Sequence, residues 1–101
     1  MRGSRGSDRA RYEQDLSHYR SRVKANKGML EGRPFLAVQL SFWLESFQFL
    51  ITTLDSWEYE GNQEKYKETI HRMEKILKHM DKLMISVEDK NYHEEDTDPE
   101  I

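Results

Sequence analysis

Hydrophobic residues in the middle of the chain follow a helical repeat. Between residues 36 and 57, large apolar side chains recur at alternating spacings of four and three: Leu36, Leu40, Trp43, Phe47, Leu50, Leu54 and Trp57. This spacing is typical of the buried seam of a helix in a bundle or coiled coil. Pro34 suits the first turn of such a helix, and Gly61 followed by Asn62 suits a turn after it. The pattern therefore predicts a helix over residues 34–58.

The same segment carries a second apolar stripe on another face. Phe35, Phe42 and Phe49 are seven residues apart, and Val38 lies beside them. At about 100° per residue, they lie on a different face of the helix from the seam. In a monomer of three helices, two neighbours cover only one broad side of a helix. We therefore expect these four residues to form an interface, covered by a second copy of the chain or by a partner helix.

Two further segments show helical seams. The seam of residues 63–89 is broad, and Ile76 and Leu83 widen it; its members are Tyr66, Ile70, Met73, Leu77, Met80, Met84 and Val87. The seam of residues 8–27 is narrow and contains Tyr12, Leu16, Tyr19 and Val23. Asp8 is the expected N-cap of this first helix, and residues 28–34 are the expected break after it. The short turn at Gly61 and Asn62 predicts an antiparallel hairpin of the last two helices.

These elements predict an all-α fold, a three-helix antiparallel bundle with a coiled-coil-like hairpin. We expect a disordered basic arm or expression remnant at residues 1–7, one domain at 8–90 and a disordered acidic tail at 91–101. A chain of 101 residues buries only a modest core, so oligomerisation is expected to contribute to its stability.

The amino-acid composition excludes several kinds of functional site. The chain has no cysteine, which excludes disulfides, thiolate nucleophiles and cysteine-ligated metals. The net charge of −3 hides an asymmetry: residues 1–28 hold eight Arg or Lys against three acids, and residues 88–101 hold seven acids against one Lys. We recognise no secretory signal and expect an intracellular protein, cytoplasmic or nuclear.

No catalytic, cofactor or metal site is expected. Glu68 and His71 have the Glu-x-x-His spacing of carboxylate-bridged metal sites, but they lie opposite the seam of their helix and are predicted to be exposed and metal-free. Glu45 is expected on a polar strip between the two apolar stripes.

Residues 35–54 have roughly membrane-spanning length, but a central acid such as Glu45 is costly in a bilayer, so no membrane span is expected. On residues 63–89, Lys67, Lys75, Lys78 and Lys82 alternate with Glu68, Glu74 and Asp81, which is typical of a solvated face.

The sequence thus favours a non-enzymatic helical interaction module: an adaptor, scaffold, chaperone or small regulator that binds by helix packing. The alternative is a helical oligomer that binds nucleic acid through its basic N-terminal region. The residues that would carry this alternative are Arg2, Arg5, Arg9, Arg11, Arg20 and Arg22. Tyr12 and Tyr19 belong to the first seam and are therefore not expected to be free to stack on bases.

Overall fold

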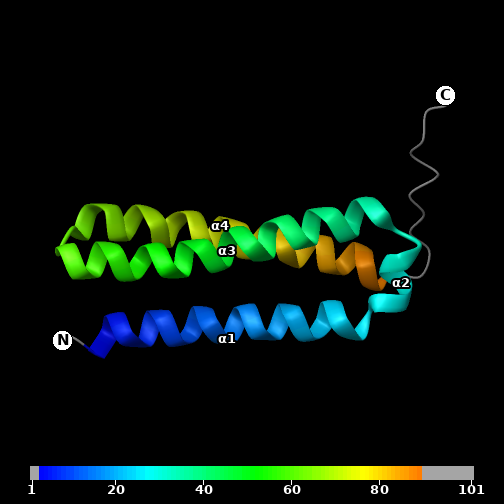
Figure 1. Cartoon of the computed structure of the whole chain (residues 1–101), viewed down its shortest axis with the longest axis horizontal. Coiled ribbons are helices and arrows are strands. Elements are labelled where there is room, and N and C mark those ends of the chain that lie inside the picture. The colour runs from blue at the N-terminus through cyan, green and yellow to red at the C-terminus, as the bar shows by residue number, and fades with distance from the viewer. Residues whose placement is uncertain (1–2, 90–101) are drawn as a thin grey trace, which may run out of the picture.

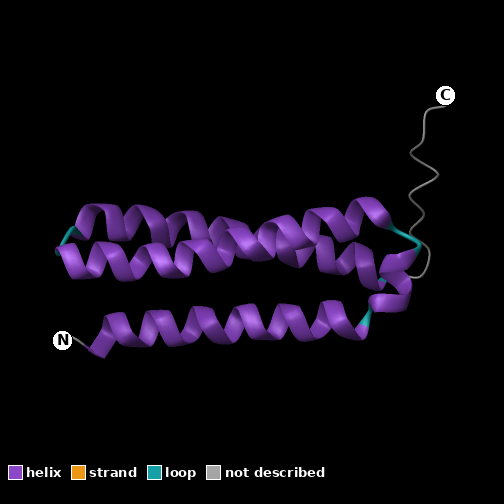
Figure 2. Ribbon diagram, in the orientation of Figure 1, coloured by secondary structure: helices purple, strands orange, loops and turns teal. Residues whose placement is uncertain are grey.

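The computed structural model describes the backbone of residues 3–89 and the side chains of residues 8–89. Over this part, the chain forms four helices and no strand: α1 (Gly3–Ala25), α2 (Lys27–Glu31), α3 (Pro34–Glu60) and α4 (Gln63–Glu88). Helix α3 runs antiparallel to both α1 and α4, and the short helix α2 turns the corner between α1 and α3 (Figures 1 and 2). The all-α prediction is confirmed. The acidic tail predicted at 91–101 lies outside the described residues.

The boundaries of α3 and α4 follow from local residue chemistry. Pro34 occupies the first turn of α3, where its missing N–H costs no hydrogen bond, as predicted. Gly61 ends α3 in a left-handed conformation with φ of 73°, which favours a residue without a Cβ. The side chain of Asn62 accepts a hydrogen bond from the backbone N–H of Lys65 at 3.1 Å and caps α4, as predicted.

The first third of the chain differs from the prediction in two places. Helix α1 begins at Gly3, so residues 3–7 are helical, and Asp8 lies inside the helix instead of capping it. The carboxylate of Asp8 accepts a hydrogen bond from the phenol of Tyr66 at 3.4 Å. Within the expected break of residues 28–34, the structure has the single turn of α2, which buries Leu30.

The three predicted seams form one core. Tyr12, Phe47, Met73 and Met80 are fully buried, and most other seam residues are buried with them. Trp43, Trp57, Ile70, Leu77 and Val23 are only partly buried and pack against the core. Helix α3 also buries Leu44 and Ile51, which lie beside its predicted seam. The seam of α3 is therefore wider than the 4-3 spacing indicates, because α1 and α4 pack on two adjacent sides of it.

Helices α1 and α4 run parallel and in register. The phenol of Tyr12 donates to the carboxylate of Glu74, and the phenol of Tyr19 donates to Asp81. The amide of Asn26 lies 3.5 Å from Glu88. Each pair is 62 positions apart, and successive pairs are one heptad apart. The acids at 74, 81 and 88 therefore serve as hydrogen-bond acceptors for α1. Glu74 is partly exposed and Asp81 is exposed, as a solvated face predicts, but their pairing with α1 was not predicted.

Candidate functional site

The aromatic stripe of α3, defined as Phe35, Val38, Phe42 and Phe49, is exposed. The exposed fractions of these four residues are 69%, 68%, 58% and 69%. Helix α1 does not cover them, because it contacts Phe47, Gln48 and Asp55, on a side of α3 roughly 150° from the stripe at about 100° per residue. The stripe thus contains four of the six exposed large hydrophobic residues of the described chain, and it has the position predicted from the sequence.

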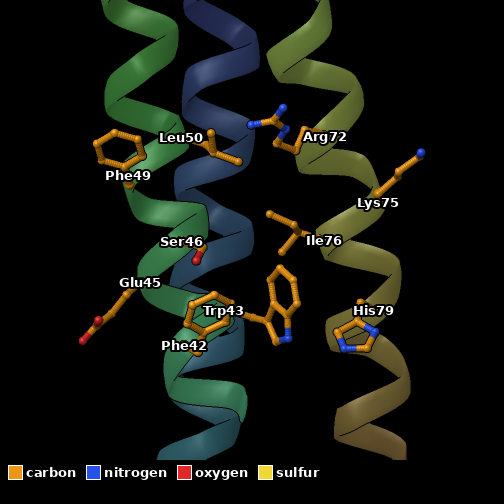
Figure 3. Close-up of a pocket in the computed structure, with 10 residues that line it drawn as sticks. All are labelled: Phe42, Trp43, Glu45, Ser46, Phe49, Leu50, Arg72, Lys75, Ile76 and His79. Atoms are coloured by element: carbon orange, nitrogen blue, oxygen red, sulfur yellow. The ribbon is translucent and has the colours of Figure 1, made fainter. Parts of the chain in front are cut away.

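A groove between α3 and α4 begins at this stripe. Its α3 wall is formed by Phe42 and Phe49, with Glu45 between them. Its α4 wall is basic and is formed by Arg72, Lys75 and His79 (Figure 3). The open volume of the groove is about 640 Å³, which lies within the range of about 300–1,000 Å³ typical of ligand sites.

The floor of the groove is apolar and consists of Trp43, Leu50 and Ile76, with Ser46 at its α3 edge. The Trp43 ring contacts Phe42 edge-to-face with ring centroids 4.9 Å apart. It also contacts His79 of α4 at 5.1 Å. These edge-to-face contacts hold Trp43 across the floor and connect the aromatic wall to the basic wall.

Three acids of α4 lie on its α1 side, and three basic residues lie on its groove side. Glu74, Asp81 and Glu88 face α1, where Arg11 pairs with Glu74 at 3.1 Å and Arg22 pairs with Glu88 at 2.8 Å. The hydrogen bond from Arg22 is the main reason that the pKa of Glu88 lies below its usual value. The basic residues Arg72, Lys75 and His79 line the groove, on the other side of α4. This arrangement was not predicted from the sequence, although the seven-residue spacing of Glu74, Asp81 and Glu88 was a visible signal for it.

Four of the six arginines of the nucleic-acid alternative have described side chains, and all four have partners within the chain. Arg9 pairs with Glu13 at 3.1 Å and with Asp55 of α3, and Arg20 donates to the side chain of Gln48. Arg11 and Arg22 pair with α4 as described above. Arg2 lies outside the described residues, and the side chain of Arg5 lies outside the described side chains.

The residues considered as catalytic or metal-binding candidates do not form a cluster. Glu45, Glu68 and His71 are all exposed. Within the described residues, no group of three or more His, Cys, Asp or Glu side chains is placed to hold a metal ion. Tyr12 and Tyr19 are buried in the core, as predicted.

Helix α3 is long and apolar enough to cross a membrane on length and composition alone. A third of its most apolar segment, 33%, is buried against the chain's own helices. Core helices of soluble bundles have the same length and composition, so this property of α3 is weak evidence for a membrane span.

Comparison with protein-family models, with curated proteins and with solved structures gave no match.

Proposed function

We propose that the chain is a non-enzymatic protein–protein interaction module that acts through the aromatic stripe of α3, by self-association or by binding a partner helix. The observation that carries this proposal is the exposure of Phe42 and Phe49 beside a groove whose floor is apolar. Apolar patches of this kind on soluble proteins commonly mark interaction sites. A helix laid into a groove between two others is a recurrent mode of recognition.

The energetic basis is burial of aromatic surface. A Phe side chain fully removed from water contributes about 1.5–3 kcal/mol, so burial of Phe42, Phe49 and their neighbours supplies a driving force for association. The module needs no catalytic group for this role. An adaptor, a scaffold, a chaperone and a small regulator all use such a surface, and we expect no cofactor.

The nucleic-acid alternative has less support. Binding to phosphates requires accessible cations, and Arg9, Arg11 and Arg22 already pair with carboxylates of the same chain. Release of these side chains would break contacts that join α1 to α3 and α4. Tyr12 and Tyr19, which would have to stack on bases, are in the core.

Size-exclusion chromatography with light scattering tests the proposal on the full chain. The wild type is expected to elute above monomer mass at tens of micromolar, or to do so when its partner is added. Phe42→Asp is expected to abolish association, because an unpaired charge cannot be buried in an apolar interface. Tyr59→Asp is the matched control, since Tyr59 is 93% exposed near the end of α3 and outside the groove. Equal association of wild type and Phe42→Asp would refute the proposal.

A further inference from the structure

The acidic and basic residues of the groove lie on opposite walls. Glu45 is the only acid among the residues that line it, and it lies on α3. Arg72, Lys75 and His79 lie on α4. In Figure 3, Glu45 points away from α4, toward the outer edge of the α3 wall. The described structure shows no ion pair between Glu45 and the basic wall, so both charges remain available to a molecule that covers the groove.

Glu45 and the basic wall are also at the same height along the bundle. The ring contact between Trp43 and His79 places residue 43 of α3 level with residue 79 of α4. Because the helices are antiparallel, Glu45 is then level with residue 77. Lys75 and His79 each lie two residues from that level, about 3 Å along the axis at about 1.5 Å per residue.

This arrangement is self-complementary under one kind of two-fold symmetry. A two-fold axis parallel to the helices preserves height and places α3 of each copy against α4 of the other. Glu45 of one copy then faces Lys75 and His79 of the second, and the same pair forms again on the other side of the axis. A two-fold axis perpendicular to the helices and centred on the groove places α3 against α3 and brings the two Glu45 carboxylates together. Charge therefore favours the parallel axis.

Helix direction is compatible with this axis and does not separate it from the perpendicular one, because neighbouring helices are antiparallel around either. Around a parallel axis, the order is α3, α4, α3 of the second copy and α4 of the second copy, and each neighbouring pair is antiparallel. This is the arrangement of an antiparallel four-helix bundle. The aromatic wall of each copy covers the apolar floor of the other, so Phe42 and Phe49 are removed from water.

We infer that the occupant of the groove is a second copy of this chain, docked about a two-fold axis parallel to the helices, with Glu45 of each copy paired to Lys75 and His79 of the other. The inference rests on the proposed function and specifies its partner and its geometry. Helix α1 stays on the outside of the dimer in both copies, because it packs on the opposite side of α3.

Complementary charge reversal tests this pairing. Analytical ultracentrifugation measures the dimer dissociation constant of the wild type, Glu45→Lys and Lys75→Glu, each full length. Each single variant places like charges opposite each other twice, and its dissociation constant is expected to rise by about tenfold or more. An equimolar mixture of the two variants restores both pairs, and its heterodimer is expected to bind within about threefold of the wild-type dimer.

Matched controls use charge reversals outside the groove. Glu60 lies at the end of α3 and Lys24 near the end of α1, and both are exposed. Glu60→Lys and Lys24→Glu change net charge by the same amounts and are expected to leave the dissociation constant unchanged. Circular dichroism of all four variants checks that helical content is retained.

The outcomes separate this inference from the proposed function. If Phe42→Asp dissociates the protein but the charge variants behave like their controls, the proposed function through the aromatic stripe is supported. The proposed pairing of Glu45 with Lys75 and His79 is then refuted. If neither Phe42→Asp nor the charge variants change association, both are refuted. A monomeric wild type that sediments with vesicles of phosphatidylserine and phosphatidylcholine, and no longer does so with Lys75→Glu, would identify a lipid surface as the occupant and overturn the inference.

Discussion

The phenol of Tyr19 on α1 donates a hydrogen bond to the carboxylate of Asp81 on α4, 62 positions along the chain. The ring of Tyr19 is buried in the core, while its oxygen reaches the edge of α4. Tyr12 repeats the arrangement one heptad earlier with Glu74. A tyrosine in the seam thus supplies both apolar surface and a polar contact. This double role explains how a helix with so narrow an apolar stripe docks in a defined register.

Loss of these hydroxyls is expected to weaken the docking of α1. Tyr19→Phe keeps the buried ring and removes one hydrogen bond, so stability is expected to fall by about 1 kcal/mol. Urea unfolding followed by circular dichroism measures this change. Tyr59→Phe is the control, since Tyr59 is almost fully exposed. A Tyr19→Phe variant as stable as the control would show that the hydrogen bond to Asp81 contributes nothing.

The same two tyrosines predict a loss of stability at alkaline pH. Burial, followed by the hydrogen bonds to Glu74 and Asp81, raises the pKa of Tyr12 and Tyr19 above the ordinary phenol value of about 10. A raised pKa in the folded state favours the protonated form there. Its contribution to stability is therefore complete below pH about 10 and is lost as pH rises toward the folded-state pKa.

Urea unfolding at pH 8, 9.5 and 11 tests this dependence. The wild type is expected to lose more stability over this range than the variant that carries both Tyr12→Phe and Tyr19→Phe. Ionisation of other groups affects both proteins, so the comparison isolates the two phenols. Identical slopes for the two proteins would contradict the assignment.

Arg33 closes the end of the bundle where α2, α3 and α4 meet. Its side chain is buried, and its Nη1 donates to the backbone carbonyls of Ser86 at 2.9 Å and Val87 at 2.8 Å. These carbonyls belong to the last turn of α4, where backbone donors run out, and the Ser86 carbonyl also accepts from the backbone N–H of Asp89 at 3.3 Å. Arg33→Ala is expected to destabilise the fold by about 1.5–3 kcal/mol, and Arg33→Lys by less. Thermal unfolding of both variants measures this, and equal melting of Arg33→Ala and wild type would contradict it.

Phe47 tests the assignment of the core. It is fully buried and contacts Tyr12 edge-to-face with ring centroids 5.8 Å apart. Phe47→Ala is expected to lower stability by about 3–5 kcal/mol through lost burial and the cavity left behind. Phe49→Ala, on the aromatic stripe of the same helix, is the matched comparison and is expected to affect the folding of the monomer far less. Similar losses in both variants at concentrations where the protein is monomeric would contradict the division of α3 into core and interface.

Much of this fold follows from the hydrophobic pattern alone. The 4-3 spacing on α3 and α4, Pro34 at the start of α3 and Asn62 at the start of α4 are local signals, and the structure confirms the elements they predict. The exposure of Phe42 was also predictable, because two neighbouring helices cannot surround a third.

The rest depends on how distant segments pack. Leu44 and Ile51 are buried because α1 lies on that side of α3, and nothing in the spacing on α3 indicates where α1 lies. The pairing of Glu74 with Tyr12 joins residues 62 positions apart. That pairing turns Glu74 toward α1, while Arg72 and Lys75 line the groove, and only the assembled bundle reveals this arrangement.

The most direct test of the central proposal is the mass of the protein in solution with and without an intact aromatic stripe. Sedimentation velocity at tens of micromolar, with circular dichroism on the same samples, compares the wild type with Phe42→Asp. We expect a dimeric wild type and a Phe42→Asp variant that is monomeric with its helical content mostly retained, since Phe42 contributes little to the monomer core. A Phe42→Asp variant that remains fully associated, with unchanged melting, would show that the aromatic stripe of α3 is not an interface.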